Sequence, residues 1–528
     1  MTSTSIGASS RGLSRKYLPR LANDAIIGFN PYIYTSGRWL RHDEQERSAR
    51  HIPFDFEALS RRVVDLSPGA SSIRECIKKE GGFNRVFLFT TDNGQRLVAK
   101  LPFTIAGPQK LTTQSEVATM HYIQTKTEIP VPKILDWNDD IFHPVKSEYI
   151  IMEHVEGVQL AQVWSMMTGD QRIRCIGTIF QHLKQVANMT FPAYGSLYYA
   201  NIPLESSCKI PLDQDYCIGP HCGAMYWGCR PSEPRYYQNV ESNHGPWSDL
   251  QAYCDGLVDT GITRVPPNPD LSTYPRYQGP PTEHLALLEP GRAVMQEISK
   301  DPRVLDAAAP LLFHPDLHKR NIFVSVDDPT VVTGIIDWQS ASVEPAFWFS
   351  QDVPDFATYT PEARDQSHFN QELCAKAYDG SVRLLLPKLA TPRLLDESLF
   401  RPFRYCYRTW KDGAVAFRHE LIETSRHWAD LGLPGSCPFA LPDDKDLAVH
   451  QDHYKRFVAA HDLRRDVAAL LNTAPDGWVP AQDWEEACKA HKELFASMSA
   501  AVLAYEDPDN DELIKSEADL REIWPFEL

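Results

Sequence analysis

The alternation of apolar and polar residues predicts a small β-sheet in the first third of the chain. Alternating runs at 73–79, 85–90 and 96–101 are separated by Glu80-Gly81-Gly82-Phe83-Asn84 and by Asp92-Asn93-Gly94. Such runs are typical of strands, and the Asn-Gly pair is typical of a hairpin turn. A further buried strand is expected within 149–157, where it runs into a linker that ends at Gly157.

Helical periodicity predicts most of the remaining elements. Apolar residues recur at helical spacing at 115–123, 170–189, 282–299 and, near the end, at about 361–385, 394–425, 445–472 and 480–505. His450, His453 and His461 are interpreted as polar-face residues. The stretch 194–283 is rich in Tyr, Trp, Gly and Pro, so we interpret it as a packed, pocket-lining insertion that has little regular structure towards its end.

The most distinctive motif runs from His314 to Asp337. His314-Pro315-Asp316 is followed by Asn321, and two short apolar runs then predict a hairpin with Asn321 at one end and Asp337 at the other. Magnesium-dependent phosphoryl transfer needs one base and two metal-binding oxygens around the terminal phosphates of a nucleotide. We interpret Asp316 as the base and Asn321 and Asp337 as the metal ligands. The alternative is a chance motif whose aspartates cap turns.

The predicted sheet carries residues suited to nucleotide phosphates. Gly81 and Gly82 allow backbone amides to approach phosphate oxygens. Lys100 ends a Leu-Val-Ala-Lys run, which is typical of the kinase strand that supplies a charge to the same phosphates. An ordinary tight turn and a solvated lysine remain the alternatives.

Two further segments complete a candidate nucleotide site. Glu116 is the one acidic residue in the early turns of the helix at 115–123, where it could pair with Lys100 or remain a solvated residue favoured by the helix dipole. The strand at 149–157 would present backbone groups of Glu153 and Val155 to an adenine edge, with Met152 packed behind. A buried strand that binds no ligand has the same pattern.

Composition excludes several classes of protein. At 528 residues the chain exceeds the usual size of one domain, and its net charge of -17 argues against nucleic acid as the main partner. No apolar run approaches the roughly twenty residues of a membrane span. The eleven cysteines show no regular spacing, which favours a reducing compartment. The cluster Cys217, His221, Cys222 and Cys229 lacks the paired spacing of zinc sites, so packed or free thiols are expected.

The first 23 residues contain no Asp or Glu and carry four basic residues, Arg11, Arg15, Lys16 and Arg20. This composition is typical of a mitochondrial transit peptide, so a mitochondrial location is expected. The alternative is a basic terminus on a cytoplasmic protein.

Taken in order, these motifs resemble the aminoglycoside phosphotransferase family of protein-kinase-like enzymes over about residues 70–350. Within that family the chain looks most like fungal mitochondrial proteins named for altered inheritance of mitochondria. It departs from the family pattern at Pro315, where a glycine is usual, and in a glycine loop that lacks the full GxGxxG.

The resemblance implies an α+β fold with two lobes, a small antiparallel β lobe and a large mainly helical lobe with a helical C-terminal extension. The implied domains are a transit peptide (1–23), an N-terminal extension (24–70), the small lobe and hinge (71–157), the large lobe (158–350) with its insertion (194–283), and the helical extension (351–528). The residues implied in ATP binding are Gly81, Gly82, Asn84, Lys100, Glu116, Met152, Glu153 and Val155.

The function implied by the resemblance is transfer of the γ-phosphoryl group of ATP, with Mg²⁺, to a hydroxyl of a small molecule. Asp316 would be the base, and Asn321 and Asp337 the Mg²⁺ ligands. His314 would support the loop. The alternative is a non-catalytic mitochondrial protein that keeps the kinase-like fold and acts as a scaffold or maintenance factor.

Overall fold

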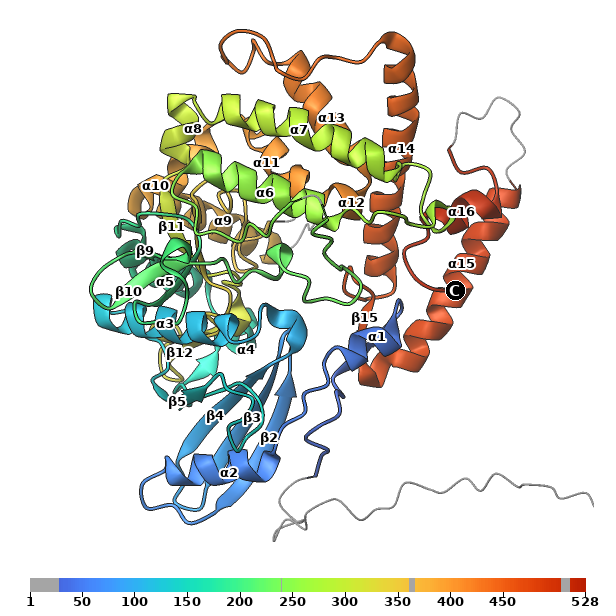
Figure 1. The fold of residues 1–528 in the computed structure, drawn as a ribbon. Coiled ribbons are helices and arrows are strands. Elements are labelled where there is room, and N and C mark those ends of the chain that lie inside the picture. The colour runs from blue at the N-terminus through green and yellow to red at the C-terminus, as the bar shows by residue number, and fades with distance from the viewer. Residues whose placement is uncertain (1–27, 239, 360–365, 505–512) are drawn as a thin grey trace, which may run out of the picture.

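The computed structural model describes residues 28–238, 240–359, 366–504 and 513–528, so the predicted transit peptide at 1–23 lies outside the described residues. The described chain forms a small β lobe and a larger, mainly helical lobe, with further helices added at the C-terminus (Figure 1). The expected α+β, two-lobed fold is confirmed. Within the described ranges, no helix has the length and apolar character needed to cross a membrane.

The small lobe is built on a five-stranded antiparallel sheet in the order β2-β3-β4-β6-β5. Phe87 and Phe89 of β3 pack against Phe56 of helix α2, and all three side chains are at most 2% exposed, so this helix covers one face of the sheet. The predicted strands are confirmed. The elements are α2 (Phe56–Asp65), β2 (Ile73–Glu80), β3 (Asn84–Thr91), β4 (Arg96–Pro102), β5 (Ile134–Asn138) and β6 (Tyr149–Glu153).

Helix α3 (Leu111–Lys126) crosses from the small lobe to the large lobe, where it lies beside a small three-stranded sheet (Figure 1). The predicted helices at 170–189 and 282–299 are confirmed as α5 and α7. The helices of this region are α4 (Leu160–Val163), α5 (Gly169–Ala187), α6 (Leu250–Arg264), α7 (Pro281–Ile298) and α8 (Pro302–Ala307).

The predicted motif from His314 to Asp337 lies among short strands. The expected hairpin is confirmed, because β12 pairs with β13 and Ile322 lies opposite Ile335. The strand after the small lobe, β7, adds to the same hairpin, while β11 pairs with β14. The strands are β7 (Val158–Gln159), β11 (Pro310–Phe313), β12 (Ile322–Val324), β13 (Val332–Ile335) and β14 (Ser342–Pro345).

The insertion at 194–283 has more regular structure than the sequence predicts. It contains the sheet β8-β10-β9 and the fifteen-residue helix α6. Gly256 and Gly261 lie inside this helix, at positions where a side chain would clash. A Cβ at Gly256 would lie 2.4 Å from Trp247, and a Cβ at Gly261 would lie 2.6 Å from the Cys406 carbonyl oxygen. Close packing therefore requires residues that read as helix breakers. The strands are β8 (Ser196–Tyr199), β9 (Ile210–Pro211) and β10 (Tyr216–Gly219).

The C-terminal extension corrects one predicted helix. The stretch 394–425 is divided into short helices, because Pro402 lies in the first turn of one of them and Gly413 ends another with a φ of 89°. The helices at 361–385, 445–472 and 480–505 are present in their described parts as α9, α14 and α15. The bounds are α9 (Gln366–Leu385), α10 (Pro387–Ala390), α11 (Arg401–Tyr405), α12 (Thr409–Asp412), α13 (Ala414–Arg426), α14 (Asp444–Leu470), α15 (Trp484–Ala504) and α16 (Glu517–Ile523).

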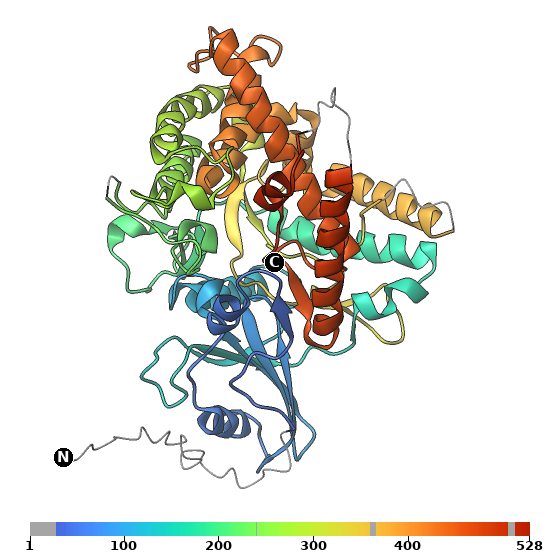
Figure 2. The ribbon, with the colours of Figure 1, turned by 90° about the vertical axis from the view of Figure 1, so that its right-hand side faces the viewer.

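The segment that precedes the small lobe is fastened to the C-terminal helices. Strand β1 (Gly37–Trp39) pairs antiparallel with β15 (Trp478–Pro480), and the short helix α1 (Asp43–Ser48) follows it. Figure 2 shows the red C-terminal helices beside this blue segment. The same segment reaches the end of β2, where the Thr35 amide donates to Glu80 at 2.7 Å. It thus links the turn at Gly81 and Gly82 to the C-terminal helices.

Candidate active site

The loop from His314 to Asn321 joins β11 to β12, and hydrogen bonds of the His314 ring hold it in place. The amide of Asp316 donates to His314 Nδ1 at 3.1 Å, so Nε2 carries the proton that it donates to the Ile336 carbonyl oxygen at 2.9 Å. Burial lowers the pKa of His314 and favours this neutral form. The ring packs on Trp338 with centroids 4.6 Å apart. His314 therefore fixes Asp316 relative to the chain that leads to Asp337.

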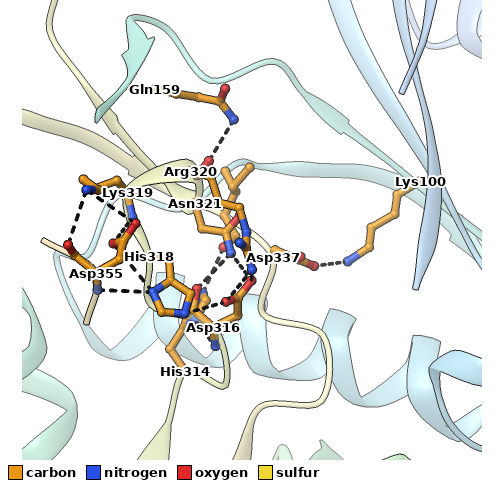
Figure 3. A network of polar contacts seen from close by, with 11 residues as sticks. Lys100, Gln159, His314, Asp316, His318, Lys319, Arg320, Asn321, Asp337 and Asp355 are labelled. Carbon is orange, nitrogen blue, oxygen red and sulfur yellow. Dashed lines mark hydrogen bonds and ion pairs between the residues drawn. The ribbon is translucent and has the colours of Figure 1, made fainter. Parts of the chain in front are cut away.

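Asp316 is surrounded by donors from its own loop (Figure 3). The side-chain amide of Asn321 donates to the carbonyl oxygen of Asp316 at 2.8 Å and to its Oδ2 at 2.9 Å. Arg320 Nη2 donates to both carboxylate oxygens at 2.8 and 2.7 Å, and His318 Nε2 lies 3.2 Å from Oδ1. The carboxylate has a fixed orientation, and 31% of its side chain is exposed to solvent.

Asp337 follows the hairpin in a left-handed backbone conformation, with a φ of 65°. Such a conformation is rare for a residue other than glycine and is concentrated at functional sites. Its Oδ1 lies 2.6 Å from Lys100 Nζ. Burial works to raise the pKa of Asp337, but the Lys100 ammonium outweighs it and the pKa is lowered. Asp337 is therefore a carboxylate, and 36% of its side chain is accessible.

Lys100 joins the two lobes. Its ammonium lies 2.6 Å from Glu116 on α3 as well as 2.6 Å from Asp337, and the predicted pair with Glu116 is confirmed. Lys100 and Glu116 are only 6% and 2% exposed. Burial works to lower the pKa of Lys100, but the two carboxylates raise it. The contact with Asp337 was not expected, since the sequence suggests only phosphates and Glu116 as partners.

The turn at Gly81 and Gly82 is exposed, and a Cβ on either glycine would meet no atom within 4 Å. Neither glycine is therefore required by packing within the chain. Asn84, at the end of this turn, instead forms two reciprocal hydrogen bonds with Gln339, of 2.8 and 3.0 Å. Both residues are 8% exposed. The side chain of Asn84, predicted to contact the nucleotide, thus ties the turn to the segment after Asp337.

The predicted hinge lies at the end of β6, at the junction of the lobes. Met152 is buried, Glu153 is exposed, and the Glu153 amide donates to the Lys133 carbonyl oxygen at 2.9 Å. Val155 packs closely on Gly334 of β13. Gly157 has a φ of 99°, and a Cβ there would lie 2.2 Å from the Val324 carbonyl oxygen. The hinge therefore crosses directly over the hairpin that carries Asn321 and Asp337.

The structure thus brings Lys100, Glu116, Asp337, Asn321 and Asp316 into one neighbourhood. Within the described residues, no hydrogen bond joins the glycine turn or the hinge to Asp316.

Besides Arg320 and His318, which contact the Asp316 carboxylate, three other contributors were missed from the sequence. Gln339 holds Asn84, Gln159 donates to the Arg320 carbonyl oxygen at 2.8 Å, and Asp355 accepts the Lys319 amide at 2.9 Å. His318 itself could have been found from a local signal, because it lies only two residues after Asp316.

The cluster of cysteines and histidine in the insertion is a packing arrangement. His221 Nε2 lies 2.5 Å from Glu344, and Cys222 Sγ lies 2.8 Å from the Tyr198 hydroxyl. Among the described residues, no three His, Cys, Asp or Glu side chains gather as a metal site would require. The expectation of packed or free thiols at Cys217, Cys222 and Cys229 agrees with this arrangement.

Residues 79–348 match the model of the phosphotransferase enzyme family. Among curated proteins, the chain is 30% identical over 303 residues to a subtelomeric hrmA-associated cluster protein of Aspergillus fumigatus, covering 51% of this chain and 57% of that protein. The match therefore spans little more than half the length of this relative. The mitochondrial protein named altered inheritance of mitochondria protein 9 from Clavispora lusitaniae is 21% identical, covering 93% of this chain and 91% of the relative.

Solved structures similar to the chain include two aminoglycoside phosphotransferases. A thermostable mutant of APH(4)-Ia in a ternary complex with ADP and hygromycin B is 13% identical, with a TM-score of 0.35, and the match covers 71% of this chain and 98% of that one. A complex of a second aminoglycoside phosphotransferase with GDP and kanamycin is also 13% identical, with a TM-score of 0.35, covering 71% and 99%.

Proposed function

The chain belongs to the phosphotransferase enzyme family, and we propose that it transfers the γ-phosphoryl group of ATP, with Mg²⁺, to a hydroxyl group of a small molecule. One observation carries the proposal. Lys100, Asp337, Asn321 and Asp316 form one neighbourhood, in which the ammonium and the amide hold the two carboxylates by contacts of 2.6 to 2.9 Å. These are the charged and polar roles that phosphoryl transfer requires.

Asp316 would accept the proton of the acceptor hydroxyl. Asn321 and Arg320 orient its carboxylate through their hydrogen bonds, and His314 holds the backbone on which it sits. Preorganised polar groups of this kind lower the barrier because they need not reorient during the reaction. Lys100, held by Glu116, would place a fixed positive charge beside the ATP phosphates.

The residues fit a magnesium ion. Asn321 donates its amide N–H groups to Asp316, which leaves its amide oxygen as the remaining ligand atom, and Asp337 supplies a partly exposed carboxylate. Mg²⁺ is usually held by one or two protein oxygens together with substrate phosphates and water. When bound, the ion would neutralise charge on the β- and γ-phosphate oxygens.

For the nucleotide, Gly81 and Gly82 would supply backbone amides near the phosphates, and Asn84 would hold this turn in place through Gln339. The backbone of Glu153 and Val155 would meet the adenine, with Met152 packed behind it. We accordingly propose residues 71–157 as the nucleotide lobe and hinge, 158–350 as the catalytic lobe with the insertion 194–283, and 351–528 as a helical extension.

Equilibrium binding of ATP by the purified chain, measured by calorimetry with and without Mg²⁺, tests the nucleotide part of the proposal. Mg²⁺ is expected to strengthen ATP binding in the unmodified protein. Asp337→Asn should abolish that gain, whereas Lys100→Met should weaken binding whether or not Mg²⁺ is present. Failure of the folded protein to bind Mg-ATP at millimolar concentration would contradict the proposal.

A mitochondrial location is supported by the mitochondrial names of several relatives and by the acid-free, basic composition of residues 1–23. Sequencing the N-terminus of the protein from isolated mitochondria tests this location. Recovery of the intact Met1 form from the cytosol alone would refute it.

A further inference from the structure

An apolar pocket lies beside the loop that carries Asp316. Its volume is about 370 Å³, and its walls come from α5, β11, α9, α10 and the segment 349–354. This volume is within the range of small-molecule sites, roughly 300 to 1,000 Å³. Most of the lining is aliphatic or aromatic, with Phe180, Leu183 and Phe349 among it, and its ionisable residues are His314, His318, Asp352 and Tyr378.

The pocket borders the residue interpreted as the base. Its wall includes Pro315 and Leu317, the neighbours of Asp316 on either side, and also His318, whose Nε2 lies 3.2 Å from Asp316 Oδ1. Figure 3 shows Lys100 on one side of this loop and His318 with Asp355 on the other. A nucleotide held at Lys100 and a molecule in the pocket would therefore approach Asp316 from opposite sides, as the two substrates of a transfer reaction must.

The lining selects the chemistry of the occupant. A polyhydroxylated or polycationic molecule would lose water in this pocket without finding enough polar partners, and unpaired polar groups are costly to bury. An alkyl or aromatic body would instead gain from leaving water. Of the lining side chains, His318 contacts the Asp316 carboxylate, so a hydroxyl group of the occupant would lie there.

We infer that this pocket binds the phosphoryl acceptor, and that the acceptor is an alcohol with an apolar body whose hydroxyl lies at His318 beside Asp316. This inference rests on the proposed function. In the reaction, a lone pair of the alcohol oxygen forms a bond to the γ-phosphorus of ATP. The bond between that phosphorus and the β–γ bridging oxygen breaks, ADP leaves with the electron pair, and the hydroxyl proton passes to Asp316.

Straight-chain primary alcohols from butan-1-ol to octan-1-ol are suitable probes, since each adds one methylene. Binding to the full-length protein without nucleotide, followed by ligand-observed NMR, should tighten about fourfold per methylene. The gain should stop when the pocket is full. With Mg-ATP, phosphorus NMR should detect the corresponding alkyl phosphate, and Asp316→Asn should abolish the product but retain alcohol binding.

Two variants test the location. Ala187→Phe places a ring into the pocket wall and should weaken octan-1-ol binding at least tenfold, whereas Ala496→Phe, the same change on the exposed face of α15, should not alter it. Unchanged ATP binding would show that Ala187→Phe is folded. Val353 also lines the pocket and is 43% exposed, so a substitution there should leave the fold intact. Val353→Asp should also weaken octan-1-ol binding.

The outcomes separate this inference from the proposed function. Affinity that does not depend on alcohol chain length, or that survives Ala187→Phe, would overturn the pocket as the acceptor site. Phosphorylation of polar acceptors that is unaffected by Ala187→Phe would do the same while leaving the kinase proposal intact. If binding depends on chain length and on Ala187 but no alkyl phosphate forms from Mg-ATP, the pocket has no acceptor role. That result would count against the proposed function, on which the acceptor role rests.

Discussion

The buried ammonium of Lys100 offers a quantitative test of the site. At the 2.6 Å separation from Glu116, the attraction is about 6 kcal/mol for an effective dielectric constant of about 20. Desolvation of both groups offsets much of this attraction. Removing one member of a buried pair typically costs about 3 to 5 kcal/mol, because the other charge remains without its partner. Lys100→Met is therefore expected to lower the free energy of unfolding by about that amount.

The double variant provides the sharper result. Glu116→Gln alone should cost about 1 to 3 kcal/mol. Combining it with Lys100→Met should restore at least about 2 kcal/mol relative to the sum of the single effects, because the buried carboxylate that lost its partner is then gone. The assay is urea unfolding followed by circular dichroism, with an unchanged slope as the condition for comparing midpoints.

A matched control is available on the surface. Lys489 is 78% exposed and lies 3.8 Å from Glu493, so Lys489→Met should cost less than about 1 kcal/mol. If Lys100→Met were no more destabilising than this control, or if the double variant were simply additive, Lys100 would not be the buried ionic link between the lobes.

Asn84→Ala or Gln339→Ala should each lower stability by about 1 to 3 kcal/mol, since the other buried amide loses both partners, and should raise KM for ATP; unchanged ATP kinetics would remove this pair from the site. Arg320→Ala should cost less than about 1 kcal/mol in urea unfolding, because Arg320 is 64% exposed, and a larger loss would show a structural role. Between pH 7.5 and 5, the free energy of unfolding should fall less for His450→Phe than for the unmodified protein; an equal fall would refute this.

The last of these predictions rests on the surroundings of His450. The ring is 4% exposed, and neither nitrogen has a hydrogen-bond partner among the described residues. Burial, together with the neighbouring His419 and arginines, lowers its pKa to about 4. In the unfolded chain the pKa is near 6.5. The unfolded state therefore binds the extra proton first, and about 1 to 3 kcal/mol of stability is lost as the pH falls from about 6.5 towards 4.

The sequence could predict what depends on local pattern. The strands β2, β3 and β4 alternate clearly and are separated by turn residues, and the hairpin is bounded by Asn321 and Asp337. Lys100 and Glu116 are only sixteen residues apart, on consecutive elements, so their pairing was accessible to reasoning about a strand followed by a helix.

Other features depend on contacts that no local pattern reveals. Asn84 and Gln339 are 255 residues apart, and each reads as an ordinary polar residue. Helix α6 was missed because its glycines are required by Trp247 and Cys406, which come from other segments. His450 was expected on a polar face, but its ring is buried against His419 and Tyr454. In each case packing between distant segments overrides the local signal.

The role of Asp316 is tested most directly by transfer of label from γ-labelled Mg-ATP into a fractionated cell metabolite extract, with the purified protein compared with its Asp316→Asn variant. A labelled product is expected that forms only with the unmodified protein and that elutes among the less polar fractions. A product formed equally by both proteins, or none with either protein while both bind Mg-ATP, would contradict the assignment of Asp316 as the base of a kinase and would favour a non-catalytic nucleotide-binding protein.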